Sequence, residues 1–115
     1  KPRERVAHIE VRALADGLFE AMIPRNLVFF EGHFRGLPIL PGTVLLERVI
    51  VPAALAYRPH IGRLAGLTRI RFMRTLGPAQ RVEVSVTETV KGRIQFEARR
   101  AGGVVATGVL LFAAA

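Results

Sequence analysis

Alternation of hydrophobic and polar residues marks a pair of short segments at the start of the chain. Residues 7–12 alternate in this way, and residues 19–23 repeat the pattern after the turn pair Asp16-Gly17 and up to Pro24. A period of two is typical of a half-buried strand, and Asp-Gly is a favoured hairpin turn. The first part of the chain therefore predicts a β-hairpin.

The second half of the chain shows strand patterns to its end. A long strand is predicted over residues 64–74, followed by strands over 82–90, 93–99 and 104–112, with turns at Lys91-Gly92 and Gly102-Gly103. The last strand is almost continuously apolar, which suits the middle of a sheet. The last three strands form an antiparallel meander.

A helix is predicted between these two regions. Residues 25–41 are irregular, and from Gly42 apolar residues recur at three- and four-residue spacing. Further apolar positions make the helix apolar nearly all round, so we expect it to be enclosed, with a kink or interruption at Pro52. The sum is one α+β domain over residues 1–115, in which a single antiparallel sheet wraps around one hydrophobic helix.

Composition narrows the class of protein without identifying a function. The chain has 115 residues, of which 23% are charged, as expected of a globular domain, and it has no cysteine. The apolar runs are too short to cross a bilayer, so no membrane insertion is predicted. No signal-peptide pattern is visible, although the first lysine suggests a trimmed fragment. A cytoplasmic protein is expected. The three histidines lack metal-ligand spacing, so neither a metal nor another cofactor is predicted.

The net charge of +8 favours an acidic partner. The basic residues are scattered along the chain, and no nucleic-acid-binding motif accompanies them. Binding to nucleic acid is therefore not predicted, and an acidic protein fits the charge as well.

One carboxylate, Glu47, lies in the middle of the apolar helix. Its burial is costly unless it is paired, protonated or open to a pocket. A salt bridge with Arg48 or with a strand arginine is one interpretation. The other is a general acid that its apolar surroundings keep protonated. The residues alone leave both interpretations open.

His33 and Gly42 could supply a base and a hydrogen-bond donor near this carboxylate. His33 lies between two glycines, and nearby phenylalanines would favour its neutral form. Gly42, at the predicted helix start, has an N–H without a helical partner and no side chain to keep a ligand carbonyl away. A base, an acid and a donor are what proton abstraction next to a carbonyl requires. A structural or solvated role for His33 stays open.

The stretch GHFRGLPILPGTVLLE, residues 32–47, resembles the signature of the FabA/FabZ-type 3-hydroxyacyl-[acyl-carrier-protein] dehydratases. The family pattern is G-H-F-P-G-x-P-[IV]-x-P-G-x-L-x-x-[ED], and the match needs one additional aliphatic position. The histidine, the glycine-proline pairs and the acid all fall at family spacing. Outside this signature the resemblance is weaker and extends over about residues 7–112.

The resemblance implies a hot-dog fold, in which a curled antiparallel sheet encloses a central helix. It also implies a homodimer, or a higher oligomer, whose active sites lie at the subunit interface, where His33 of one protomer faces Glu47 of the other. The implied reaction is the reversible loss of water from a (3R)-3-hydroxyacyl thioester, carried on acyl carrier protein or on CoA, in fatty-acid or related acyl-chain biosynthesis.

The resemblance also implies roles for individual residues. His33 would move the C2 proton, and Glu47 would protonate or orient the departing hydroxyl. The Gly42 N–H would hold the thioester carbonyl, and the Ile39 carbonyl would orient the imidazole. Candidates for the acyl pocket are Phe29, Phe30, Phe34 and Leu46, with core packing as the alternative. Candidates for carrier-protein contacts are Arg35, Arg69 and Arg71, with solvated surface charge as the alternative.

Two departures from the family pattern qualify the expected pathway. Arg35 replaces the proline that follows His-Phe, and the Ala-Met-Ala-Gln that usually follows the acid is replaced by residues 48–51 and then Pro52. A specialised relative, serving a pathway such as polyketide or aryl polyene assembly, therefore fits as well as primary fatty-acid synthesis. Two other functions stay open: a hot-dog thioesterase, and a non-catalytic carrier-binding domain with its pocket closed by the Pro52 kink.

Overall fold

The computed structural model describes residues 4–30 and 38–114. Within these ranges the chain forms one antiparallel sheet, one helix of three consecutive parts, and one 3-10 turn. The elements in chain order are β1 Val11–Ala15, β2 Leu18–Met22, the 3-10 turn η1 Val28–Phe30, α1 Gly42–Leu45, the π-helical turn η2 Leu46–Ile50, α2 Val51–Tyr57, β3 Arg63–Phe72, β4 Arg81–Val90, β5 Arg93–Arg100 and β6 Gly103–Ala113.

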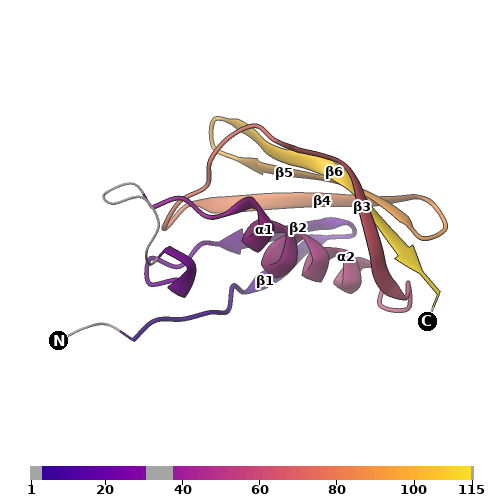
Figure 1. Ribbon diagram of the computed structural model, residues 1–115, viewed down its shortest axis with the longest axis horizontal. Helices are drawn as coiled ribbons and strands as arrows, with labels where there is room; N and C mark the ends of the chain where they lie inside the picture. Colours follow the sequence, from indigo (N-terminus) through magenta and orange to yellow (C-terminus); the bar gives the residue numbers. More distant parts are fainter. Residues whose placement is uncertain (1–3, 31–37, 115) are drawn as a thin grey trace.

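The six strands lie in the order β1-β2-β4-β5-β6-β3, and every neighbouring pair is antiparallel. The helix lies against one face of this curled sheet (Figure 1). The predicted hairpin, helix and meander are all present, and the arrangement is the hot-dog fold. Although β3 follows the helix in sequence, it pairs with β6, so it lies at the edge of the sheet farthest from β1.

The first strand begins later than predicted, at Val11 instead of residue 7. The turn at Asp16-Gly17 sets a register in which Val11 pairs with Ala21. Continued in the same register, His8 would lie opposite Pro24, which has no N–H to donate to a ladder. Pairing therefore ends near Val11. The segment before it forms a single parallel bridge, between Val6 and Leu27.

The predicted turns lie where the glycines place them, with one small shift. Gly17 and Gly92 have positive φ angles of 74° and 81°, which residues with a side chain rarely adopt. A Cβ on Gly17 would also lie 2.8 Å from the Val86 carbonyl oxygen. The last turn is formed by Ala101-Gly102, so β6 starts at Gly103, one residue earlier than predicted.

The hydrophobic core lies between the sheet and one side of the helix. From the helix it contains Leu45, Leu46, Val49, Ile50, Ala53 and Ala54, which pack with inward-facing residues of β2, β4, β5 and β6. The opposite side of the helix is open in the single chain, where Glu47 and Ala56 are exposed and Leu55 is 39% exposed. The prediction of an enclosed helix is therefore wrong for the single chain, because one sheet covers only one side.

Regular α-helical hydrogen bonding is interrupted just before Pro52, as predicted, but the chain stays helical through the proline. The turn before it is π-helical, with the Val51 N–H donating to the Leu46 carbonyl five residues earlier. A proline ring in a regular α-helix clashes with the preceding turn and removes one hydrogen bond. The wider π turn relieves that clash, and α2 continues through Pro52 to Tyr57.

Among the described residues, no helix is long and apolar enough to cross a membrane.

Candidate active site

The Glu47 carboxylate lies on the open side of the central helix. Its side chain is 74% exposed, and its Oε1 accepts a hydrogen bond from Arg48 Nε at 3.2 Å. The expectation of a buried acid in apolar surroundings is therefore wrong for the single chain. The salt bridge with Arg48, the alternative drawn from the sequence, is present. At this exposure an ion pair adds little to the stability of the fold. The carboxylate of Glu47 also stays accessible to a ligand, because most of its side chain is exposed.

A groove of about 270 Å³ runs beside Glu47, between the helix and the segment that leads into β1. Its lining includes His8, Glu10, Glu47 and Arg48, with Pro52 and Ala56 from further along the helix. Charged and apolar side chains therefore meet next to the carboxylate. The groove is open in the single chain.

Gly42 begins the helix, as predicted. The preceding Pro41 has extended backbone angles, and its carbonyl accepts from the N–H groups of Val44 and Leu45. Within the described part of the chain, the Gly42 N–H donates to no backbone acceptor. This is the arrangement that a donor for a ligand carbonyl needs.

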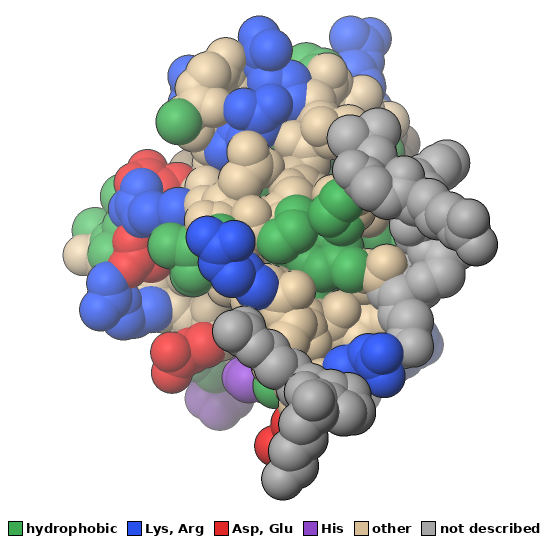
Figure 2. Space-filling model, turned by 90° about the vertical axis from the view of Figure 1, so that its left-hand side faces the viewer, with side chains coloured by type: hydrophobic (Ala, Val, Ile, Leu, Met, Phe, Trp, Pro, Cys, Tyr) green, Lys and Arg blue, Asp and Glu red, His purple; other side chains and the backbone are tan. Residues whose placement is uncertain are grey.

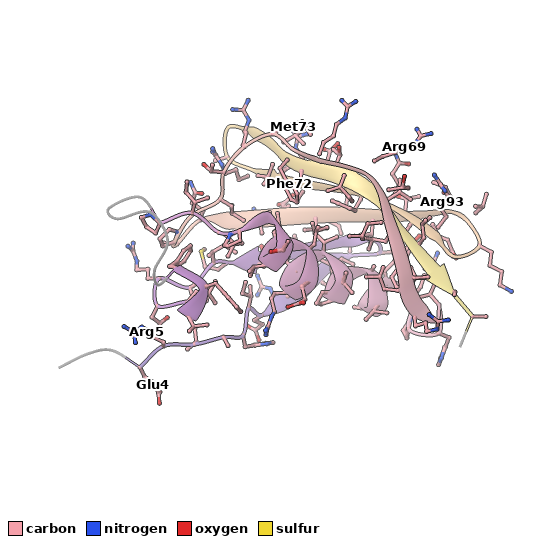
Figure 3. All side chains as sticks on the ribbon, in the orientation of Figure 1. Glu4, Arg5, Arg69, Phe72, Met73 and Arg93 are labelled. Atoms are coloured by element: carbon pink, nitrogen blue, oxygen red, sulfur yellow. The ribbon has the colours of Figure 1, made fainter. Side chains whose placement is uncertain are left out.

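The aromatic ring of Phe72 lies directly against Gly42. A Cβ on Gly42 would come within 2.6 Å of Phe72 Cζ, far closer than non-bonded carbons approach. Phe72 projects from the edge strand β3 toward the helix, whereas Arg69 lies on the other side of the sheet (Figure 3). The absence of a side chain at Gly42 thus has a packing reason besides the predicted ligand contact.

The candidate pocket residues differ in burial. Phe29 and Phe30 form η1 and pack, half-buried, against the core. Leu46 is only 8% exposed and belongs to the core, so packing between helix and sheet explains it. Ile39 is half-buried, and the neighbouring Leu40 N–H donates to the Leu76 carbonyl at 2.7 Å, which fixes this segment against the chain before β4.

Three predicted site residues, His33, Phe34 and Arg35, lie outside the described residues. The roles of His33 as base, Phe34 as pocket wall and Arg35 as carrier contact therefore stay predictions.

Arg69 and Arg71 line a groove of about 660 Å³ on the face of the sheet opposite the helix. Its remaining lining comes mainly from outward-facing polar residues of β4, β5 and β6. The register of β3 against β6 shifts between Thr68 and Arg71, and Arg69 has a positive φ of 57°. Such a bulge redirects side chains. It explains how both arginines reach the same groove.

Ion pairs hold the surface of the sheet at two other places. Hydrogen bonds from Arg12 and then Arg81 hold the pKa of Glu20 below its ordinary value. The pKa of Glu88 is lowered by the Gly92 N–H and then by Arg58. Both glutamates are engaged by several donors, which suits structural roles and distinguishes them from Glu47.

Sequence reasoning missed the roles of Arg48 and Phe72. Arg48 was noted only among the residues that depart from the family pattern and as one possible salt-bridge partner, and Phe72 was not singled out. For Arg48 the signal was its place beside the acid. Because Phe72 is 30 positions from Gly42 in sequence, only the strand order brings the two together.

Curated proteins similar to this chain are named as dehydratases. A protein of Chloroflexus aggregans is 33% identical over 86% of this chain and 66% of its own length, and one of Herpetosiphon aurantiacus is 34% identical over 96% and 84%. Both are named 3-hydroxyacyl-[acyl-carrier-protein] dehydratase FabZ. The chain thus spans just under two thirds of the Chloroflexus protein, and a match in Syntrophomonas wolfei covers 53% of that protein.

Solved structures support the same fold. A chain of the dehydratase heterocomplex ApeI:P from Xenorhabdus doucetiae aligns over 95% of this chain and 97% of its own, with a TM-score of 0.72 and 16% identity. An uncharacterised protein from Erwinia carotovora aligns over 89% and 88%, with a TM-score of 0.68 and 19% identity.

A family model that covers most of the chain identifies its family. The family model for ApeI-like dehydratases matches residues 12–109. The chain belongs to this family, and the resemblance to FabA/FabZ-type dehydratases is confirmed.

Proposed function

We propose that this chain catalyses the reversible dehydration of a (3R)-3-hydroxyacyl thioester to a trans-2-enoyl thioester. The observation that carries the proposal is the exposed carboxylate of Glu47 on the central helix of a dehydratase-family domain. A side chain that served only the core would not leave its charged end in a groove at the open side of the helix. We further propose that the protein acts in the cytoplasm.

In the proposed reaction the base removes a proton from C2 of the acyl chain. The C2–C3 double bond forms as the C3–O bond breaks, and the hydroxyl leaves as water after gaining a proton. His33 is the proposed base, and Glu47 protonates or orients the departing hydroxyl. The Gly42 N–H stabilises negative charge on the thioester oxygen, and the Ile39 carbonyl orients the imidazole.

The acyl chain is proposed to lie against Phe29, Phe30 and Phe34. The half-buried state of Phe29 and Phe30 supports this, because each ring has both packed and accessible surface. Leu46 would contribute at most the small exposed part of its side chain.

We propose a homodimer in which His33 of one protomer and Glu47 of the other share a site. The strand β3 is ten residues long, and in the described chain its only neighbour is β6. Leu67 and Phe72, on its helix-facing side, are 47% and 50% exposed. A long edge strand with exposed apolar residues is rarely left uncovered. A second copy would cover both this edge and the open side of the helix.

The proposed carrier of the thioester is an acidic acyl carrier protein, with CoA as the alternative. The net charge of +8 supports this choice, and basic side chains spread over much of the face shown in Figure 2. Arg69 and Arg71 are exposed, and in the described part of the chain neither has an ion-pair partner. Arg35 is a further candidate contact on sequence grounds.

The reaction can be tested in reverse with crotonyl and 2-decenoyl thioesters. Loss of enoyl absorbance without release of free thiol supports a dehydratase, whereas free thiol indicates a thioesterase. Absence of both, with several chain lengths on CoA and on a carrier protein, would contradict catalysis. His33→Ala and Glu47→Gln should each lower hydration about 10²–10⁴-fold without unfolding the domain, and wild-type activity in either removes that residue from the mechanism.

The shared site can be tested by mixing the two inactive variants after dissociation. A mixed dimer of His33→Ala and Glu47→Gln chains has one site with both native residues if the site spans the interface. We expect about a quarter of wild-type activity, because half of randomly mixed dimers are mixed and each has one intact site. No recovery, in dimers shown to have exchanged, means that both residues of a site come from one chain.

A further inference from the structure

Arg48, the residue after Glu47, connects three separate segments of the chain. Its Nε donates to Glu47 Oε1 at 3.2 Å, and its Nη1 donates to the Ala7 carbonyl at 3.4 Å. Its Cζ lies 5.0 Å from the centroid of the Phe29 ring, on η1. The guanidinium is thus attached to the chain before β1 and to η1 as well as to the helix.

The π-helical turn favours the contact between Glu47 and Arg48. Consecutive residues of a regular α-helix point in different directions and do not face each other. Glu47 and Arg48 lie in η2, where the chain needs more residues to complete a turn. Each residue therefore turns through a smaller angle, which brings the two side chains closer together.

We propose that Arg48 is a positioning residue that holds the Glu47 carboxylate in its working orientation. This inference rests on the proposed dehydratase function. Among the described residues, Arg48 is the one hydrogen-bonding partner of the Glu47 side chain, which is otherwise free to rotate in solvent. Arg48 is better fixed, with 39% of its side chain exposed and its guanidinium over an aromatic ring. Anchoring one oxygen leaves the other free to meet the departing hydroxyl.

The effect should appear in turnover and not in stability. An exposed Glu–Arg pair contributes little to folding, but misplacing a reacting group slows the chemical step. A lysine could still reach the carboxylate, but it would lose the planar contact with Phe29.

The test compares kcat and KM for enoyl-thioester hydration in Arg48→Ala, Arg48→Lys and Arg48→Met. We expect Arg48→Ala and Arg48→Met to lower kcat about tenfold with KM changed less than about twofold, and Arg48→Lys to recover part of the loss. Arg48→Met keeps the apolar stem against Phe29, so it replaces Arg48→Ala if that variant fails to fold. The matched control is Arg99→Ala, which removes an exposed pair with Glu97 of 2.8 Å on the other face of the sheet. It should leave kcat unchanged.

A double variant distinguishes positioning from an independent role. If Arg48 acts through Glu47, Arg48→Ala should lower the residual activity of Glu47→Gln by less than about twofold. Wild-type kcat in Arg48→Met, or a full additional loss in the double variant, overturns the proposal while the dehydratase function stands. An inactive wild-type protein overturns both.

Discussion

The two ends of the central helix carry the same kind of ion pair in different surroundings. Toward the N-terminal end, Glu47 is 74% exposed and is held by Arg48. At the C-terminal end, Arg58 pairs with Glu88 of β4 at 3.1 Å, and the Glu88 side chain is 24% exposed. A glutamate paired with an arginine therefore does not by itself indicate a catalytic or a structural role. The number of further hydrogen-bond partners of the glutamate distinguishes the two roles.

The C-terminal pair is part of a closed network. The Tyr57 hydroxyl accepts hydrogen bonds from Arg58 Nη2 and from the Glu88 N–H, and Glu88 Oε2 accepts from the Gly92 N–H. The guanidinium of Arg58 also lies 3.8 Å from the centre of the Tyr57 ring. This network fastens the helix end to the β4–β5 turn. Both oxygens of Glu88 accept hydrogen bonds, whereas among the described residues only one oxygen of Glu47 does.

The largest expected effect is on catalytic activity, and it distinguishes Glu47 from Glu88. Glu47→Gln should lower hydration of an enoyl thioester about 10²–10⁴-fold, the range for loss of a general acid or base, with unchanged unfolding. Glu88→Gln should keep wild-type kcat. Steady-state kinetics and thermal unfolding of both variants check this. Equal loss of activity in the two would show that the contrast in exposure has no bearing on function.

A smaller effect, on the stability of the fold, is expected for a substitution where the N-terminal end of the helix contacts β3. In Gly42→Ala, the new methyl group would collide with the Phe72 ring. Phe72 is half-exposed and can swing aside, so we expect a loss of about 1 kcal/mol in the free energy of unfolding, at the low end for overpacking. Denaturant unfolding measures it.

The control for this prediction is Phe72→Ala. Adding Gly42→Ala to a Phe72→Ala background should cost less than adding it to the wild type, because the ring that it meets is gone. An equal cost in both backgrounds would contradict the steric explanation and point to the helix start itself.

Replacing Pro52 tests whether the π turn accommodates the proline ring without strain. An interior helical proline is about 3 kcal/mol less favourable than alanine. Because the π turn already accommodates the ring, Pro52→Ala should stabilise the domain by less than about 1 kcal/mol. Chemical denaturation gives the value. A gain near 3 kcal/mol would mean that the π turn does not relieve the proline.

The contrast between the two helix ends also shows what the sequence could predict. Residues 42–57 have the apolar spacing of a helix, and the glycines at 17 and 92 mark turns, because both signals are local. Glu47 could be chosen by its type and its place in the family signature. The π turn could not be predicted, since Pro52 is equally compatible with a kink.

Contacts between distant segments could not be predicted from the sequence for a different reason. The pairing of Arg58 with Glu88 and the packing of Phe72 on Gly42 depend on the strand order, in which β3 crosses to the far side of β6. No periodicity encodes that order. The exposure of Glu47 likewise depends on how far one sheet reaches around the helix, which hydrophobic pattern alone cannot specify.

The smallest expected effect concerns the pH dependence of the C-terminal network. The pKa of Glu88 is held below its ordinary value of 4.5, first by the Gly92 N–H and then by Arg58. A carboxylate with a lowered folded-state pKa stabilises the fold above its unfolded pKa, and this contribution is lost as the pH falls through the folded value.

Glu88→Gln removes the charge but keeps a hydrogen-bond acceptor. The variant should therefore be slightly less stable than the wild type at pH 7, and the difference should shrink below about pH 4.5. Glu20, whose pKa is also lowered, is present in both proteins and cancels. Thermal unfolding at pH 7 and pH 3 measures the difference, and a gap that stays constant with pH would show that the charge of Glu88 does not fasten this end of the helix.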